Sequence, residues 1–107
     1  MHRVLIVDDE EPIRNVLSAS LQDEGYIVET ANNGEKALRM MEEFKPEVTL
    51  LDIWMPGRLD GVEVLREAKK TNPDLDFIIM SGHGTIETAV KTTKYGARDF
   101  VEKPLSI

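Results

Sequence analysis

The chain has 107 residues, of which 41% are hydrophobic and 31% charged, and its formal net charge is −7. These values indicate one globular domain with its own hydrophobic core and exclude a disordered or fibrous chain. The negative charge argues against direct binding to nucleic acid phosphates, and no apolar run approaches the ~20 residues that a membrane span needs.

The sequence contains no cysteine, which excludes a disulfide framework and a thiolate metal site. We interpret this as favouring a reducing cytoplasm. The apolar run in the first residues, MHRVLIVDDEE, is too short before the acids begin to form a signal peptide.

Short apolar runs alternate with stretches of helical spacing along the chain. In the first half these predict, in order, a strand at Val4–Val7, a helix between Pro12 and Gly25, a strand at Tyr26–Val28 and a helix between Asn33 and Pro46.

The same alternation continues in the second half of the chain. Asp60 and Glu63 form an Asp variant of the capping box at the start of a helix. The predicted elements are a strand at Val48–Leu51, the helix that Asp60 opens, a strand at Phe77–Met80, a helix between Thr85 and Gly96, and a strand at Phe100–Val101.

Alternating strands and helices predict an α/β fold, a doubly wound parallel sheet covered on both faces. With the strand order 2-1-3-4-5, right-handed crossovers place the first helix alone on one face and three helices on the other. The chain stops at Leu105-Ser106-Ile107, so we expect the fifth helix to be largely missing. Either the chain is shortened, or another molecule completes that face.

Polar residues follow the predicted strands at a single edge of the sheet. The acids Asp8 to Glu11 follow the first strand, Asp52 follows the third, Ser81 the fourth and Lys103 the fifth. Parallel α/β sheets bind ligands at the carboxyl ends of their strands. Each residue also has an ordinary explanation, such as acids at a helix N-terminus. The presence of all of them at one edge of the sheet nevertheless favours a ligand-binding site there.

Carboxylates at this edge need a counter-charge. Neighbouring strands lie about 4.8 Å apart, and two unit charges about 5 Å apart repel by about 3 kcal/mol at an effective dielectric constant of about 20. Lys103 supplies one positive charge. An all-oxygen site without His or Cys ligands suits magnesium, manganese or calcium.

Other common sites are absent from the sequence. It has no dinucleotide-binding Gly-x-Gly-x-x-Gly after the first strand, no P-loop and no Gly-x-Ser-x-Gly elbow. His2 and His83 are its only imidazoles, and neither has a metal-ligand partner at helical spacing.

Four motifs in order, VLIVDDEEPIR, LLDIWMPG–DG, FIIMSGHG and DFVEKPL, resemble the receiver domain of two-component response regulators over essentially the whole chain. The segment SGHGTIETAVKTTKYGARDFVEKPLS resembles receivers of nitrogen-regulation-type transcriptional activators, whose central ATPase works on an alternative sigma factor. The resemblance implies a single receiver domain over residues 1–107, with a flavodoxin-like five-stranded sheet that lacks most of its last helix.

The resemblance also implies roles for the residues at the sheet edge. Asp52 would be the phosphoacceptor, and Ser81 and Lys103 would contact phosphoryl oxygens. Asp8 and Asp9 would hold magnesium, or manganese in its place, together with Asp52 and the backbone carbonyl of Trp54.

Further roles concern residues around the site. Phe100 would be a switch residue whose burial follows Ser81, and the Lys103-Pro104 peptide would be cis. Trp54 and His83 would flank the site, and we expect Trp54 to screen the acyl phosphate from water.

The implied function is a phosphorylation-controlled switch in the cytoplasm. A sensor histidine kinase would be the donor, and the output would be a change of protein partner that controls transcription. The domain would catalyse only its own phosphorylation and slow autodephosphorylation. The output domain is absent from this chain, a homodimer or swapped dimer stays open, and neither nucleic acid nor membrane is expected to be a direct partner.

Two alternatives stay open. One is a receiver-like interaction module that does not use phosphorylation, which the intact Asp8, Asp9, Asp52, Ser81 and Lys103 disfavour. The other is a magnesium-dependent phosphatase, which would need a second acid where Trp54 stands.

The loop from Met55 to Asp60 departs from the family pattern, because it is one residue longer than usual. We predict a local rearrangement before the third helix, with Asp60 still capping it.

Overall fold

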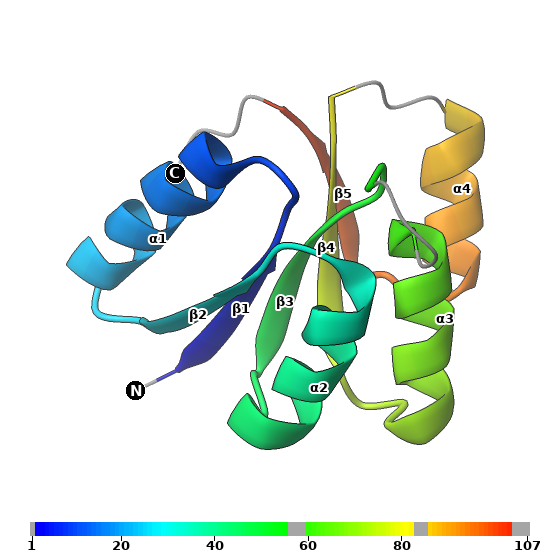
Figure 1. Cartoon of the computed structure of the whole chain (residues 1–107). Coiled ribbons are helices and arrows are strands. Elements are labelled where there is room, and N and C mark those ends of the chain that lie inside the picture. Colours follow the sequence, from blue (N-terminus) through cyan, green and yellow to red (C-terminus); the bar gives the residue numbers. More distant parts are fainter. Residues whose placement is uncertain (1, 56–59, 83–85, 104–107) are drawn as a thin grey trace.

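The computed structural model describes residues 2–55, 60–82 and 86–103. Within these residues strands and helices alternate along the chain (Figure 1). They are β1 (Arg3–Val7), α1 (Glu11–Asp23), β2 (Ile27–Ala31), α2 (Gly34–Phe44), β3 (Val48–Asp52), α3 (Gly61–Thr71), β4 (Asp76–Ser81), α4 (Ile86–Lys94) and β5 (Asp99–Glu102).

The strands form one parallel sheet in the order β2-β1-β3-β4-β5, which confirms the predicted fold class and topology. Figure 1 shows α1 on one side of the sheet and α2, α3 and α4 on the other, as right-handed crossovers require.

The predicted bounds of the second strand were wrong. β2 begins at Ile27 rather than Tyr26 and continues to Ala31, pairing with β1 along its whole length. It is an edge strand, and its more exposed positions alternate with more buried ones, so Glu29 and Thr30 belong to it although they interrupt the apolar run.

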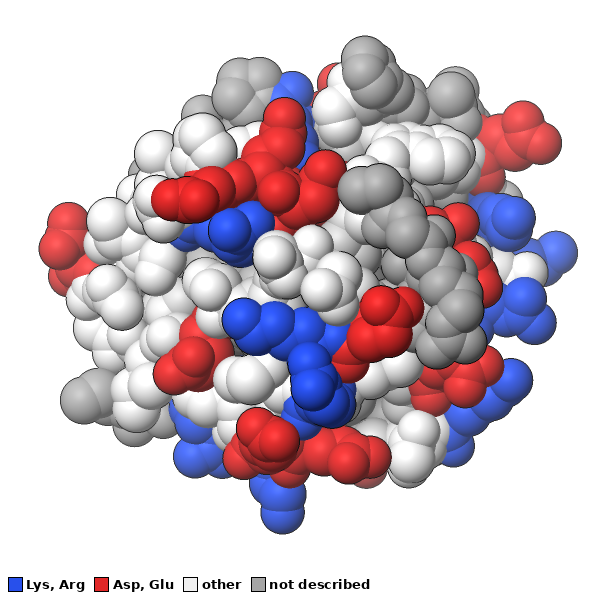
Figure 2. All heavy atoms as spheres, viewed as in Figure 1, with Lys and Arg blue, Asp and Glu red and all other residues white. Residues whose placement is uncertain are grey.

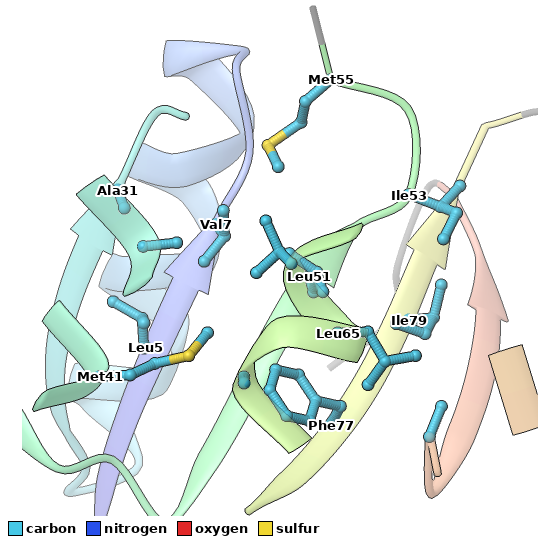
Figure 3. Packing of buried hydrophobic residues seen from close by; sticks show 14 residues of the cluster. Leu5, Val7, Ala31, Met41, Leu51, Ile53, Met55, Leu65, Phe77 and Ile79 are labelled. Carbon is cyan, nitrogen blue, oxygen red and sulfur yellow. The ribbon is translucent and has the colours of Figure 1, made fainter. Parts of the chain in front are cut away.

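Two hydrophobic clusters hold the layers together. The larger lies between the sheet and α2 and α3, where Leu5 and Phe77 face Met41 and Leu65 (Figure 3). The smaller lies under α1, where Leu17 packs against the other face of the sheet. Each strand therefore presents alternate residues to the two layers, as its two-residue period dictates.

The starts of the helices follow local sequence signals. The side chain of Asn33 accepts a hydrogen bond from the backbone N–H of Lys36 at the start of α2. At α3 the predicted capping box is present in both directions between Asp60 and Glu63. Each such cap is worth about 1 kcal/mol.

Few of the described side chains of α4 are buried. Of the side chains described in residues 87–94, Thr92 is the buried one. Its hydroxyl donates to backbone carbonyls of its own helix, those of Thr88 and Ala89. Val90 of the same helix is 58% exposed.

A groove of about 800 Å³ lies between the C-terminal ends of α2 and α3, with Leu38, Met41, Ala68 and Leu75 among its lining residues. It opens at the sheet edge opposite to the carboxyl ends of the strands, so it is separate from the predicted site. No helix among the described residues is long and apolar enough to cross a membrane.

Candidate functional site

The carboxyl ends of the central strands meet at one edge of the sheet (Figure 1), and acidic side chains gather on the surface there (Figure 2). Val7 of β1 pairs with Leu51 of β3, so the next residues, Asp8 and Asp52, stand side by side. On the other side of β3, β4 ends in Ser81, whose carbonyl accepts from the backbone N–H of Lys103 at 2.8 Å. The structure thus brings these four predicted residues to one place.

Three carboxylates form the centre of the site. One oxygen each from Asp8, Asp9 and Asp52 lies within 4.8 Å of the others. Asp8 and Asp52 are 0% and 3% exposed, whereas Asp9 is exposed. The predicted spacing of about 5 Å is therefore confirmed, and the buried pair makes the cluster electrostatically costly without a counter-charge.

Lys103, which directly follows the edge strand β5, supplies that charge. Its Nζ atom lies 2.7 Å from Oδ2 of Asp8, 3.5 Å from Oδ2 of Asp52 and 3.7 Å from Oε2 of Glu10. Burial lowers the pKa of Lys103, but the contacts with Asp8 and Asp52 outweigh it, so the pKa is raised overall. The ammonium group therefore stays charged.

Asp52 has an unusual protonation equilibrium. Burial and the neighbouring Asp8 carboxylate raise the pKa of Asp52 to about 7, against the opposing effects of Lys103 and of the backbone N–H of Trp54. That N–H donates to Oδ1 of Asp52 at 3.2 Å. In the metal-free protein a large fraction of Asp52 is therefore protonated near neutral pH.

Hydrogen bonds fix the turn between β1 and α1. The backbone N–H of Asp8 donates to the carbonyl of Ala31 at 3.1 Å, and Oδ1 of Asp8 accepts from the backbone N–H of Glu10 at 2.9 Å. Nη1 of Arg14 donates to the carbonyl of Asp8 at 2.8 Å. Sequence reasoning missed Arg14, because no spacing rule says that a side chain from α1 reaches back to the strand.

The donor set fits a hard divalent cation. Its ligand atoms are carboxylate oxygens, which Mg²⁺ and Mn²⁺ prefer. The buried Oδ2 of Asp8 contacts Lys103 but has no hydrogen bond of adequate geometry from any described residue. A buried carboxylate oxygen with incomplete hydrogen bonding can bind a cation that displaces Lys103, so Asp8, Asp9 and Asp52 would hold it.

Gly61 lets α3 approach the nucleophile candidate closely. A Cβ atom at this position would lie 2.4 Å from the carbonyl oxygen of Asp52 and 2.5 Å from Cα of Ile53. The N–H of Gly61 donates to the carbonyl of Ile53 at 3.1 Å. Sequence reasoning used only Asp60 of the Asp60-Gly61 pair and missed this contact.

The remaining predicted residues lie around the cluster. Trp54 is 56% exposed beside Asp52, and the role of its carbonyl as a ligand stays a prediction. Phe100 of β5 is half-buried against the larger hydrophobic cluster, and its switching role is likewise untested. His83, Pro104 and the lengthened part of the loop after Met55 lie outside the described residues.

Residues 4–107 match the family described as response regulator receiver domain. The chain is 49% identical over 104 residues to a putative NtrX-like response regulator of Rickettsia felis, covering 96% of this chain and 22% of that protein. It is 45% identical over 106 residues to the nitrogen assimilation regulatory protein NtrX of Azorhizobium caulinodans, covering 98% and 23%. The chain thus spans less than a quarter of these relatives.

Solved structures agree in fold. The receiver domain of NtrX from Brucella abortus superimposes with a TM-score of 0.90 at 45% identity, covering 96% of this chain and 87% of that one. A receiver domain protein from Methanospirillum hungatei gives a TM-score of 0.93 at 32% identity, covering 99% and 84%.

Proposed function

Because the chain belongs to the response regulator receiver domain family, we propose that Asp52 accepts a phosphoryl group from the phosphohistidine of a sensor kinase. The observation that carries the proposal is the position of Asp52: it lies within one cluster with Asp8 and Asp9, and 3.5 Å from the ammonium group of Lys103. Asp52 thus has a candidate cation site on one side and a positively charged ammonium group on the other, and phosphoryl transfer requires such positive charge around the transferred group.

In the transfer, an oxygen of Asp52 forms a bond to phosphorus while the bond between phosphorus and the donor imidazole nitrogen breaks. The electron pair of the broken bond stays on that nitrogen. Lys103 moves toward the new phosphoryl oxygens, and Ser81, buried at the end of the neighbouring strand, is in position to bond another. A bound magnesium ion would supply positive charge that keeps Asp52 ionised and neutralises the phosphoryl oxygens.

The phosphorylated domain would then exchange protein partners. Phosphorylation adds negative charge and new hydrogen-bond acceptors at the carboxyl end of β3, beside the carboxyl ends of β4 and β5. We propose that the resulting change controls transcription through an output domain, that the domain works in the cytoplasm, and that it catalyses only its own phosphorylation and slow dephosphorylation.

Intact mass spectrometry after incubation with acetyl phosphate and Mg²⁺ tests the proposal. We expect one phosphoryl adduct in the unmodified protein and in Asp74→Asn, an exposed acid far from the cluster. The adduct should be absent in Asp52→Asn and after chelation. A folded protein that gains no adduct would instead support the interaction module that does not use phosphorylation.

A further inference from the structure

The turn between β1 and α1 carries both Asp8 and Asp9, and one side chain outside the cluster holds it. We infer that Arg14 is a positioning residue, whose guanidinium group orients this turn for cation binding. The inference rests on the proposed function, since it concerns the same cation.

Arg14 holds the turn at both of its ends. Nη1 donates to the carbonyl of Asp8 at 2.8 Å, and the backbone N–H of Arg14 donates to the carbonyl of Glu10 at 3.1 Å. Asp9 is the single residue between these two carbonyl groups. The half-buried Arg14 side chain therefore fixes the backbone on the strand side of Asp9, and its helix fixes the other side.

The two carboxylates depend on this bond to different degrees. The side chain of Asp8 is held independently by the N–H of Glu10 and by Lys103. Asp9 is exposed, so packing constrains it little, and its carboxylate is held by the backbone of the turn and by its hydrogen bond with the Asp52 side chain. Loss of the Arg14 bond should therefore act mainly through Asp9. Groups that orient metal ligands typically change metal affinity by about 10–100-fold when they are mutated.

The charge of Arg14 has the opposite effect. A positive charge near the cluster repels a cation, so its removal alone would strengthen Mg²⁺ binding. A positioning role predicts weaker binding instead. The sign of the change thus separates the two roles, and Arg14→Lys, whose ammonium keeps the charge and can still donate one hydrogen bond to the carbonyl of Asp8, should lie between the unmodified protein and Arg14→Met.

The experiment is a Mg²⁺ titration followed by the fluorescence of Trp54, the single tryptophan of the chain, with thermal unfolding of each metal-free variant. We expect the Kd for Mg²⁺ to rise about tenfold in Arg14→Met and less in Arg14→Lys. Arg39→Met, which removes an exposed arginine of α2, should leave the Kd unchanged.

A lower Tm with an unchanged or smaller Kd in Arg14→Met would overturn the inference and assign Arg14 a purely structural role. If Arg14→Met does not fold, an unchanged Kd for Mg²⁺ in Arg14→Lys would likewise overturn the inference. Absence of Mg²⁺ binding by the unmodified protein would overturn the proposed function and this inference together. If only the Arg14 role fails, the unmodified protein still binds Mg²⁺, and the Kd of the variant is equal to or smaller than that of the unmodified protein.

Discussion

Lys103 sits closer to Asp8 than to Asp52: its Nζ atom lies 2.7 Å from Oδ2 of Asp8 and 3.5 Å from Oδ2 of Asp52. In the metal-free protein the lysine thus neutralises the carboxylates that would hold a cation. Lys103 and a divalent cation therefore compete for the same oxygens, and cation binding would release the lysine for the phosphoryl group.

Lys103→Met should accordingly bind Mg²⁺ more tightly, by about tenfold or 1.4 kcal/mol. Without metal its free energy of unfolding should fall by about 3 kcal/mol, because the buried carboxylates lose their partner. Mg²⁺ titration and urea unfolding measure the two effects, with Lys94→Met as an exposed control on α4. Weaker Mg²⁺ binding in Lys103→Met would contradict the competition.

The raised pKa of Asp52 predicts how stability depends on pH. Its pKa of about 7 in the folded protein exceeds its value of about 3.9 in an unfolded chain, so between these values the folded state binds more protons. The contribution of Asp52 to stability is therefore largest at low pH and is lost as the pH rises toward 7.

Urea unfolding without metal at pH 5 and pH 8 checks this. The unmodified protein should lose about 3 kcal/mol more than Asp52→Asn between the two pH values, since Asn does not titrate and all other groups are shared. Equal losses in both proteins would show that Asp52 titrates normally.

Gly61→Ala should disturb the nucleophile itself. The added methyl group would meet the carbonyl oxygen of Asp52 at 2.4 Å, so α3 or the end of β3 has to move. We expect a loss of stability of about 2 kcal/mol and slower phosphorylation by acetyl phosphate. Gly82→Ala is the matched control for stability, because no heavy atom lies within 4 Å of its Cβ position. Equal stability of the two variants would refute the close approach.

Trp54→Ala tests whether the indole screens the acyl phosphate. Asp52 keeps its hydrogen bond from the backbone N–H at this position, so the variant removes only the side chain. We expect several-fold faster loss of the phosphoryl group, measured by intact mass over time, and a nearly unchanged rate in Trp54→Phe. An unchanged rate of phosphoryl loss in Trp54→Ala would show that the indole does not screen the acyl phosphate.

The sequence was sufficient to predict the topology and most of the cluster, since strand ends in a parallel sheet must share an edge. Contacts that depend on three-dimensional reach were missed. The side chain of Arg14 returns from α1 to Asp8, and Gly61 matters only because α3 is packed against β3. Glu10 was equally consistent with a helix-terminal acid, yet its carboxylate lies 3.7 Å from Lys103.

The sparse packing of α4 has an energetic consequence. Its buried Thr92 satisfies its hydroxyl within the helix, so no hydrogen bond of that side chain has to break when the helix shifts over the sheet. Moving a two-state equilibrium from a 1% to a 99% population takes a differential free energy of about 5.5 kcal/mol. Under the proposed function, phosphorylation of Asp52 would supply that free energy, and the few buried side chains among the described residues of α4 would oppose a movement of the helix only weakly.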